Sequence, residues 1–441
     1  MKVSMVGANK YSHPFVKMTI CLWLCSLLGF IDFYVPSMVV YLRVILLSLA
    51  VVYFFKIRIL KTSKFGFLYS FFVAWSFFIV FRGTLVGNLP LLSNGTGFQY
   101  SLIEIFKHAY GSFSIFDFLL PCVILIDFNQ VKLSRILKTL LMLSFLSTII
   151  IVWGLYQFRV PIFFSPLIGG YTQYVFKGEQ VMVRYFINVI YFGLNGIILF
   201  SYANRYLLKK YIVFPIAIVV YFLLNVWGGA RGDSALAAGF VLTFFYLSYS
   251  FKDSSAFGNK NNKLTVVLFF ILVISGVVYL YNKTMTFDFL LGRVFEGGEV
   301  GGEFASSTRE GFTNDLINDF NERVWPWIIG KGVNGYYHLS DGGMREWMEW
   351  GYLWLVLKGG IIYLVLYVAV LLRSFYLGVF KSSNLFSRAC GFICLWQVIA
   401  LFPYGVPTIS FNMFVVWICC GMMLHPEIRR CDNLYFRQCL K

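Results

Sequence analysis

The chain has 441 residues, of which 59% are hydrophobic and only 13% are charged, and its mean hydropathy is +0.74. This composition lies outside the range of soluble domains and is typical of polytopic membrane proteins. A formal net charge of +17 would fit a nucleic-acid-binding protein. The basic residues, however, lie in short clusters between hydrophobic segments, which is how membrane topology is encoded. We therefore expect a membrane protein and no nucleic-acid partner.

About 12 hydrophobic segments are long enough to cross a bilayer, since about 20 apolar residues suffice. In the first half of the chain they cover residues 15–35, 38–55, 65–81, 113–128, 136–158 and 184–202. In the second half they cover residues 211–228, 235–251, 264–281, 353–376, 389–402 and 411–424. The segment at 113–128 is the weakest of these, because Asp117 and Asp127 lie near its ends and Pro121 lies inside it. The pattern predicts an all-α polytopic integral membrane protein with about 12 transmembrane helices.

Basic clusters follow every second hydrophobic segment, and this alternation predicts the orientation of the chain. They lie at residues 56–64, 132–138, 205–210, 252–263, 373–388 and 429–441. Both termini are therefore expected in the cytoplasm, and the long polar stretch outside. We expect an N-terminal transmembrane bundle of about nine helices over residues 1–282, and a large outside loop over 283–352. C-terminal transmembrane helices and a short basic cytoplasmic tail then cover 353–441.

The outside loop is the only long polar stretch of the sequence. From Lys283 to Glu349 it carries six basic and eleven acidic side chains. Its pattern predicts partly helical character, because apolar residues recur at helical spacing at Phe312, Leu316, Ile317 and Phe320. The segment Gly330–Gly335 fits a G-x-G-x-x-G pattern but lacks the βαβ context of a dinucleotide site, so we interpret it as a tight turn.

Catalytic motifs for metal-dependent or serine hydrolysis are missing from the sequence, which contains neither H-E-x-x-H nor G-x-S-x-G and only four histidines. The candidate groups are arginines and carboxylates. Arg231 follows Gly-Gly-Ala at the outer end of a hydrophobic segment, where its guanidinium could bind phosphate. The alternative for Arg231 is snorkelling to headgroups or pairing with Asp233. Adjacent pairs such as Arg345 and Glu346 are by default surface salt bridges.

Several short motifs resemble those of the O-antigen polymerase and O-antigen ligase superfamily of bacterial membrane glycosyltransferases. They are Arg231 in Gly-Gly-Ala-Arg-Gly, Arg309 early in the outside loop, Trp325–Ile329 before Gly330-Lys-Gly332, and Glu349-Trp-Gly-Tyr-Leu leading into Lys358-Gly359-Gly360-Ile361. Ligases typically carry a histidine where this chain has Glu349. The sequence is thus more similar to the polymerase branch.

The resemblance implies an enzyme that polymerises undecaprenyl-diphosphate-linked oligosaccharide repeat units into O-antigen, capsular polysaccharide or exopolysaccharide. The reaction would take place on the periplasmic face of the bacterial inner membrane, without metal, cofactor or nucleotide sugar. Arg231 and Arg309 would bind the donor diphosphate, and Glu349 would act as general base or orient the acceptor. Expected partners are the growing lipid-linked glycan, membrane lipid and a chain-length regulator.

Two other functions fit the same pattern. A ligase would transfer finished glycan to lipid A or another acceptor. A lipid-linked oligosaccharide flippase or other transporter also needs about 12 spans, although its charges should lie inside the spans rather than at their ends.

Overall fold

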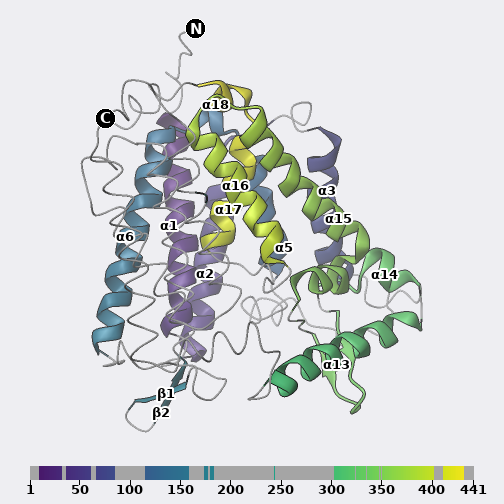
Figure 1. Cartoon of the computed structure of the whole chain (residues 1–441). Coiled ribbons are helices and arrows are strands. Elements are labelled where there is room, and N and C mark those ends of the chain that lie inside the picture. Colours follow the sequence, from purple (N-terminus) through teal and green to yellow (C-terminus); the bar gives the residue numbers. More distant parts are fainter. Residues whose placement is uncertain are drawn as a thin grey trace, which may run out of the picture. The chain divides into compact units, whose positions relative to one another are not determined.

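The computed structural model describes residues 9–31, 36–60, 66–84, 115–157, 173–176, 179–182, 243, 302–322, 324–333, 335–346, 348, 350–401 and 411–431. These residues are mostly helical, as the sequence predicts (Figure 1). The chain divides into two compact units, one of Met1–Thr139 with Ser307–Lys441 and one of Leu140–Ser306. These units are defined by how the chain packs. They do not test the predicted boundaries of the N-terminal bundle (1–282), the outside loop (283–352) and the C-terminal helices (353–441), which stay a prediction.

The first three hydrophobic segments form helices at the expected places. They are α1 (Asn9–Ile31), α2 (Pro36–Phe55) and α3 (Phe67–Thr84). α1 packs along α2, whereas α3 packs against the C-terminal part of the chain.

The fourth hydrophobic segment does not form the single α-helix that its hydrophobicity predicts. It is divided into α5 (Ile115–Leu119) and the 3₁₀-helices η3 (Leu120–Leu125) and η4 (Phe128–Gln130). Pro121 lies at the start of η3, where a residue without a backbone N–H is tolerated but cannot extend α5. α5 and η3 together measure about 20 Å along their axes, which is less than the roughly 30 Å of a bilayer core.

The fifth segment forms α6 (Leu133–Gln157). After it, β1 (Gln173–Phe176) and β2 (Glu179–Met182) form an antiparallel pair with Gln173 opposite Met182, which the sequence did not predict. Apart from Thr243, the segments predicted between residues 184 and 281 lie outside the described residues.

The outside loop contains the helix that its apolar spacing predicts. α13 (Gly302–Asn321) buries Leu316 and Phe320 completely. α14 (Trp325–Ile329) follows, and a small antiparallel hairpin is formed by β3 (Tyr337–His338) and β4 (Met344–Arg345).

The C-terminal part contains α15 (Gly351–Phe380), α16 (Leu385–Ala400), α17 (Phe411–Met423) and α18 (Pro426–Arg430). Among the described residues, α15 is the one helix that is long and apolar enough to cross a membrane. It packs against α16, α3 and α17, so it is the central element of this unit.

Aromatic side chains form the core between α3, α15 and α17. The ring of Phe72 stacks on Tyr363 with centroids 5.6 Å apart, and it lies equally close to Trp417. Phe118 of α5 stacks on Trp354 at 5.3 Å. Because such large rings dominate core energetics, these contacts fix α15 against its neighbours.

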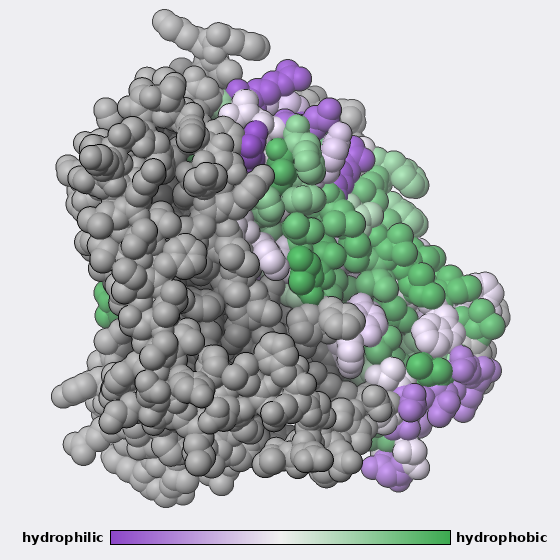
Figure 2. Space-filling model, in the orientation of Figure 1, coloured by the Kyte–Doolittle hydropathy of each residue, from purple (hydrophilic) through white to green (hydrophobic). Residues whose placement is uncertain are grey.

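The outer surface over α15 is hydrophobic along the helix and hydrophilic beyond both of its ends, as Figure 2 shows. Large apolar side chains of α3 and α15 are exposed rather than packed. They are Phe67, Phe77, Phe81, Ile361, Val365, Leu372, Tyr376 and Phe380. An apolar surface of this extent marks contact with another apolar phase or partner.

α15 is kinked at Gly360, where the backbone has a φ of 72° and a ψ of −179°. A Cβ at this position would lie 2.1 Å from the carbonyl oxygen of Ile328. At Gly330, whose φ is 71°, a Cβ would lie 2.5 Å from the backbone nitrogens of Gly359 and Gly360. The chain after α14 therefore packs backbone against backbone on the kink, and only glycine fits on both sides.

Replacing Gly360 by Ala should lower the free energy of unfolding by about 1 to 3 kcal/mol from backbone strain alone. Thermal unfolding in detergent measures this loss. Gly311→Ala in α13 is the matched control, because its new Cβ meets nothing within 4 Å and the change should be neutral or slightly stabilising. An unchanged unfolding temperature for Gly360→Ala would contradict the kink.

Candidate functional site

The candidate site lies where the turn Gly330–Gly335 meets the kink of α15. A break in a helix leaves backbone carbonyls without intrahelical partners. Two such carbonyls, of Leu357 and Lys358, accept hydrogen bonds from the backbone N–H groups of Lys331 at 2.7 Å and Gly332 at 2.9 Å. The turn thus supplies the hydrogen-bond donors that these two carbonyls at the kink would otherwise lack. Its own hydrogen bond, from the N–H of Gly335 to the carbonyl of Gly332 at 3.0 Å, confirms the predicted tight turn.

α3 also forms hydrogen bonds with this turn and with the kink of α15. The indole N–H of Trp75 donates to the carbonyl of Gly359 at 2.9 Å, and the N–H of Val333 donates to the carbonyl of Ile79 at 3.2 Å. The buried guanidinium of Arg82 donates to the carbonyls of Ile329, at 3.1 Å, and Gly330. α3, the turn and α15 therefore form one hydrogen-bonded assembly.

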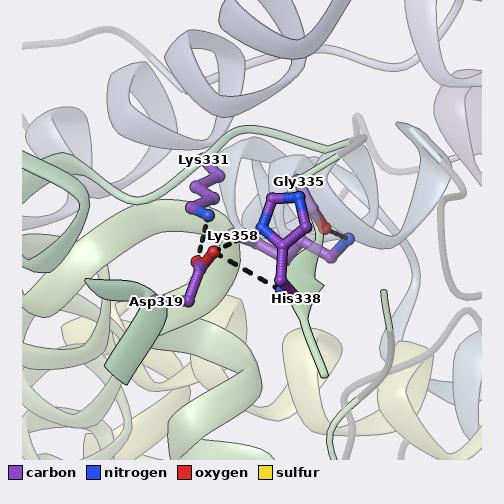
Figure 3. Close-up of polar contacts among 5 residues, drawn as sticks. All are labelled: Asp319, Lys331, Gly335, His338 and Lys358. Carbon is purple, nitrogen blue, oxygen red and sulfur yellow. Dashed lines mark hydrogen bonds and ion pairs between the residues drawn. The ribbon is translucent and has the colours of Figure 1, made fainter. Parts of the chain in front are cut away.

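Lys358 is completely buried beneath the turn. Its ammonium donates to the carbonyls of Val333 at 3.0 Å and Gly335 at 2.7 Å, the latter bond being visible in Figure 3. The carboxylates of Glu346 and Asp117 act on it electrostatically. A buried charge is costly unless it is paired and hydrogen-bonded. The two carbonyls and the two carboxylates together offset the cost of burying the Lys358 ammonium.

Glu346 lies between β4 and α15 and is half-buried. Burial raises the pKa of its carboxyl to about 7, and the positive charge of Lys358 opposes this shift. The Oε2 atom of Glu346 is inaccessible to solvent and accepts no hydrogen bond from the part of the chain that the structure describes. A carboxylate in this state is able to gain or lose a proton near neutral pH.

Asp319 near the end of α13 joins the side chains of Lys331 and His338 (Figure 3). One oxygen accepts from the ammonium of Lys331, and the other lies 2.7 Å from Nδ1 of His338. The Asp319 and Lys331 side chains are 5% and 6% exposed, whereas the His338 side chain is 54% exposed. This network therefore ties α13 to both the turn and the hairpin, and leaves the far side of the imidazole open to solvent.

Of the three site residues predicted from the sequence, the structure describes only Arg309. Arg309 lies within α13, about two turns before Leu316. Arg231 and Glu349 lie outside the described residues, although Met348 and Trp350 on either side of Glu349 are described. The proposed grouping of these three residues therefore stays a prediction.

Several site residues escaped the sequence argument. The sequence did contain a signal for Lys358, because an ionisable residue inside a long apolar segment normally marks a buried partner or a function. Asp319 and His338 had none, since only the fold brings them together. The default salt bridge between Arg345 and Glu346 is not what the structure shows. The guanidinium of Arg345 instead lies 3.6 Å from the ring centroid of Phe312, and Glu346 interacts with Lys358.

Comparison with known proteins identifies no relative: no family model, no curated protein and no solved structure matches this chain.

Replacing Lys358 by Met should destabilise the fold by about 3 to 5 kcal/mol, because two buried carbonyls lose their donor and Glu346 loses its counter-charge. Chemical or thermal unfolding in detergent measures the effect. Lys138→Met removes an exposed lysine and should change stability by less than about 0.5 kcal/mol. Equal stabilities for the two variants would show that Lys358 does not hold the turn.

Replacing Asp319 by Asn keeps the side-chain size but removes the charge between Lys331 and His338. We expect about 10- to 100-fold faster hydrogen exchange at the backbone amides of 331–338, since a charge-assisted bond contributes about 1.5 to 3 kcal/mol. Exchange followed by mass spectrometry measures this directly. Asp315→Asn on the same helix is the control. Exchange as slow as in the unchanged protein would rule out an anchoring role for Asp319.

Proposed function

We propose that this protein is an integral inner-membrane glycosyltransferase that polymerises undecaprenyl-diphosphate-linked oligosaccharide repeat units on the periplasmic face. Its products would be O-antigen, capsular polysaccharide or exopolysaccharide. In this proposal about 12 helices cross the membrane, both termini are cytoplasmic and the polar loop is periplasmic. The reaction uses a lipid-diphosphate-linked donor and the growing lipid-linked glycan as its substrates.

The observation that carries this proposal is the meeting of two motif segments that are distant in sequence. The residues that resemble the polymerase branch include Gly330-Lys-Gly332 and Lys358-Gly359-Gly360. In the fold, Gly330 lies directly against Gly359 and Gly360, and the N–H of Gly332 donates to the carbonyl of Lys358. Motifs that belong to one functional unit should come together in this way, whereas chance matches have no reason to do so.

The surface of the molecule supports the membrane location. The hydrophobic surface over α15, with hydrophilic residues beyond both ends (Figure 2), has the distribution that a bilayer requires. Beyond one end of this surface lies α13, the polar helix of the loop (Figure 1). The polar loop and the kink of α15 would then lie near the level of the headgroups, where a lipid-linked diphosphate is found.

The chemistry needs two tasks from the protein. A sugar hydroxyl of the acceptor attacks the anomeric carbon of the donor, and the lipid diphosphate leaves with the bonding electrons. Arg231 and Arg309 would stabilise the negative charge on the leaving group, because each guanidinium presents a planar set of donors and stays charged at any working pH. Glu349 would serve the acceptor, either as general base or by orienting the attacking hydroxyl.

Replacing Arg231, Arg309 or Glu349 by Ala should abolish long glycan chains in cells and leave single repeats attached to their acceptor. Each change removes a charge that the transition state uses, so we expect at least a ~100-fold loss of polymerisation. Gel analysis of extracted glycan measures chain length. Arg58→Ala, at an exposed arginine outside the proposed machinery, should leave the chain-length distribution unchanged.

Long chains that persist in the Arg309→Ala or Glu349→Ala strain would overturn the role given to that residue. A deletion strain separates the polymerase from its rivals. Single-repeat decoration supports polymerisation, whereas loss of all decoration favours a ligase. Elongation of lipid-linked repeats by the purified protein in detergent excludes transport alone.

A further inference from the structure

Four basic side chains gather at the C-terminal end of α15. Arg373 belongs to α15, Lys381 follows it directly, and Arg429 and Arg430 belong to α18. The guanidinium of Arg429 donates to the carbonyl of Lys381 at 3.2 Å, which places α18 beside the end of α15. The guanidinium of Arg373 lies 5.5 Å from the ring centroid of Tyr69, and Arg429 interacts electrostatically with the same tyrosine. The four residues therefore form one basic cluster, although they come from two distant parts of the sequence.

Hydrogen bonds to the backbone hold α18 at this place. The side-chain amide of the buried Asn384, at the start of α16, donates to three carbonyls at 2.9 to 3.1 Å, those of Ile428, Arg429 and Cys431. The N–H of Ser383 also donates to the carbonyl of Arg429, at 2.9 Å. Because these bonds fix the backbone that carries two of the cations, the basic cluster is formed before a ligand binds.

The charges of the basic cluster are not neutralised by salt bridges. None of its four cations forms a salt bridge with a carboxylate of the described residues. Glu427 of α18 interacts electrostatically with Arg429, but its Oε2 atom accepts a hydrogen bond from Asn129 at 3.1 Å. Every member of the cluster except Arg429 is exposed. Like charges that are held close together repel one another, and an anion bound to the cluster relieves this repulsion.

Exposed aromatic side chains border the basic cluster. Arg373, Tyr376 and Phe380 follow one another at spacings of three and four residues, so they lie on one face of α15, and all three are exposed. Phe380 is 65% exposed, and Phe67 at the start of α3 is 82% exposed. A Cβ on Gly66, next to Phe67, would lie 3.9 Å from the guanidinium of Arg373. The start of α3 therefore belongs to the same surface, which combines cations with uncovered apolar rings.

We propose that this surface binds an anionic phospholipid, with the phosphate of the headgroup on the basic cluster and an acyl chain along the rings of Tyr376 and Phe380. Guanidinium groups bind phosphate through several N–H donors, and basic sites beside membrane helices attract anionic headgroups. A free phosphate would leave the apolar rings uncovered, whereas a zwitterionic lipid would bring a further cation to the cluster. This binding is independent of the polymerase function and requires only the proposed membrane location.

Native mass spectrometry of the purified full-length protein in neutral detergent tests the site. Phosphatidylglycerol and phosphatidylcholine with identical acyl chains are the probes. The unchanged protein should bind phosphatidylglycerol at least about tenfold more tightly, because each basic residue near an anionic headgroup contributes about fivefold. Arg373→Gln combined with Lys381→Gln should therefore weaken phosphatidylglycerol binding about 10- to 30-fold, and phosphatidylcholine binding much less.

Three controls separate the headgroup from the acyl chain. Lys132→Gln combined with Lys138→Gln removes two exposed lysines from another basic segment, and should leave both affinities unchanged. Phe380→Ser should weaken the binding of both lipids, because it removes an apolar contact that does not depend on charge. Inorganic phosphate at the concentration of the lipid should displace neither lipid.

The outcomes that contradict the site differ from those that contradict the membrane location. Equal affinities of the unchanged protein for the two lipids, or equal losses in the two double variants, would overturn the site and leave the cations a topological role alone. Unchanged binding in Phe380→Ser together with displacement by inorganic phosphate would show an anion site without an acyl-chain contact, which also overturns the phospholipid. Recovery of the protein from cells in the soluble fraction without detergent would instead refute the membrane location itself. None of these results depends on whether lipid-linked glycan is polymerised.

Discussion

The break in α15 at Gly360 is the constraint on which the rest of the site depends. It releases the carbonyls of Leu357 and Lys358, which then accept hydrogen bonds from the turn after α14. Because the contact is made by backbone atoms on both sides, it fixes the turn more closely than side-chain packing could. The loop between α13 and α15 is thereby part of the helical unit rather than a free domain.

This backbone contact determines where the charges lie. Three buried cations, Arg82, Lys331 and Lys358, surround the turn, and each of them is bound in a different way. Arg82, which belongs to α3, donates to the backbone carbonyl of Ile329. Lys331 pairs with Asp319 on α13, and Lys358, which belongs to α15, donates to the carbonyl of Val333. The cations therefore connect three elements to one short turn. Glu346 lies at the edge of this network, where its buried Oε2 atom accepts no hydrogen bond from the described residues.

The sequence predicted those features that arise from local patterns. Hydrophobic length located α1, α2, α3, α15, α16 and α17, and apolar spacing located α13. It did not predict the break at Pro121, because a short 3₁₀-helix is as hydrophobic as a spanning α-helix. Nor did it predict that Gly330 would meet Gly360, or Asp319 would meet His338, since these contacts depend on the tertiary path of the chain. Adjacent charges in sequence were misleading for the same reason: Arg345 and Glu346 turn to different partners.

The same architecture indicates where the loop can open. The turn cannot leave α15 without exposing carbonyls of the kink and the ammonium of Lys358, so its opening is costly. The hairpin of β3 and β4 has only two paired residues on each strand, and its tip at Gly342 and Gly343 is at least partly exposed. Few buried contacts and short pairing are the marks of low local stability. Glu346 follows β4 directly, so opening of the hairpin would change access to its carboxylate while Lys358 and the turn stay in place.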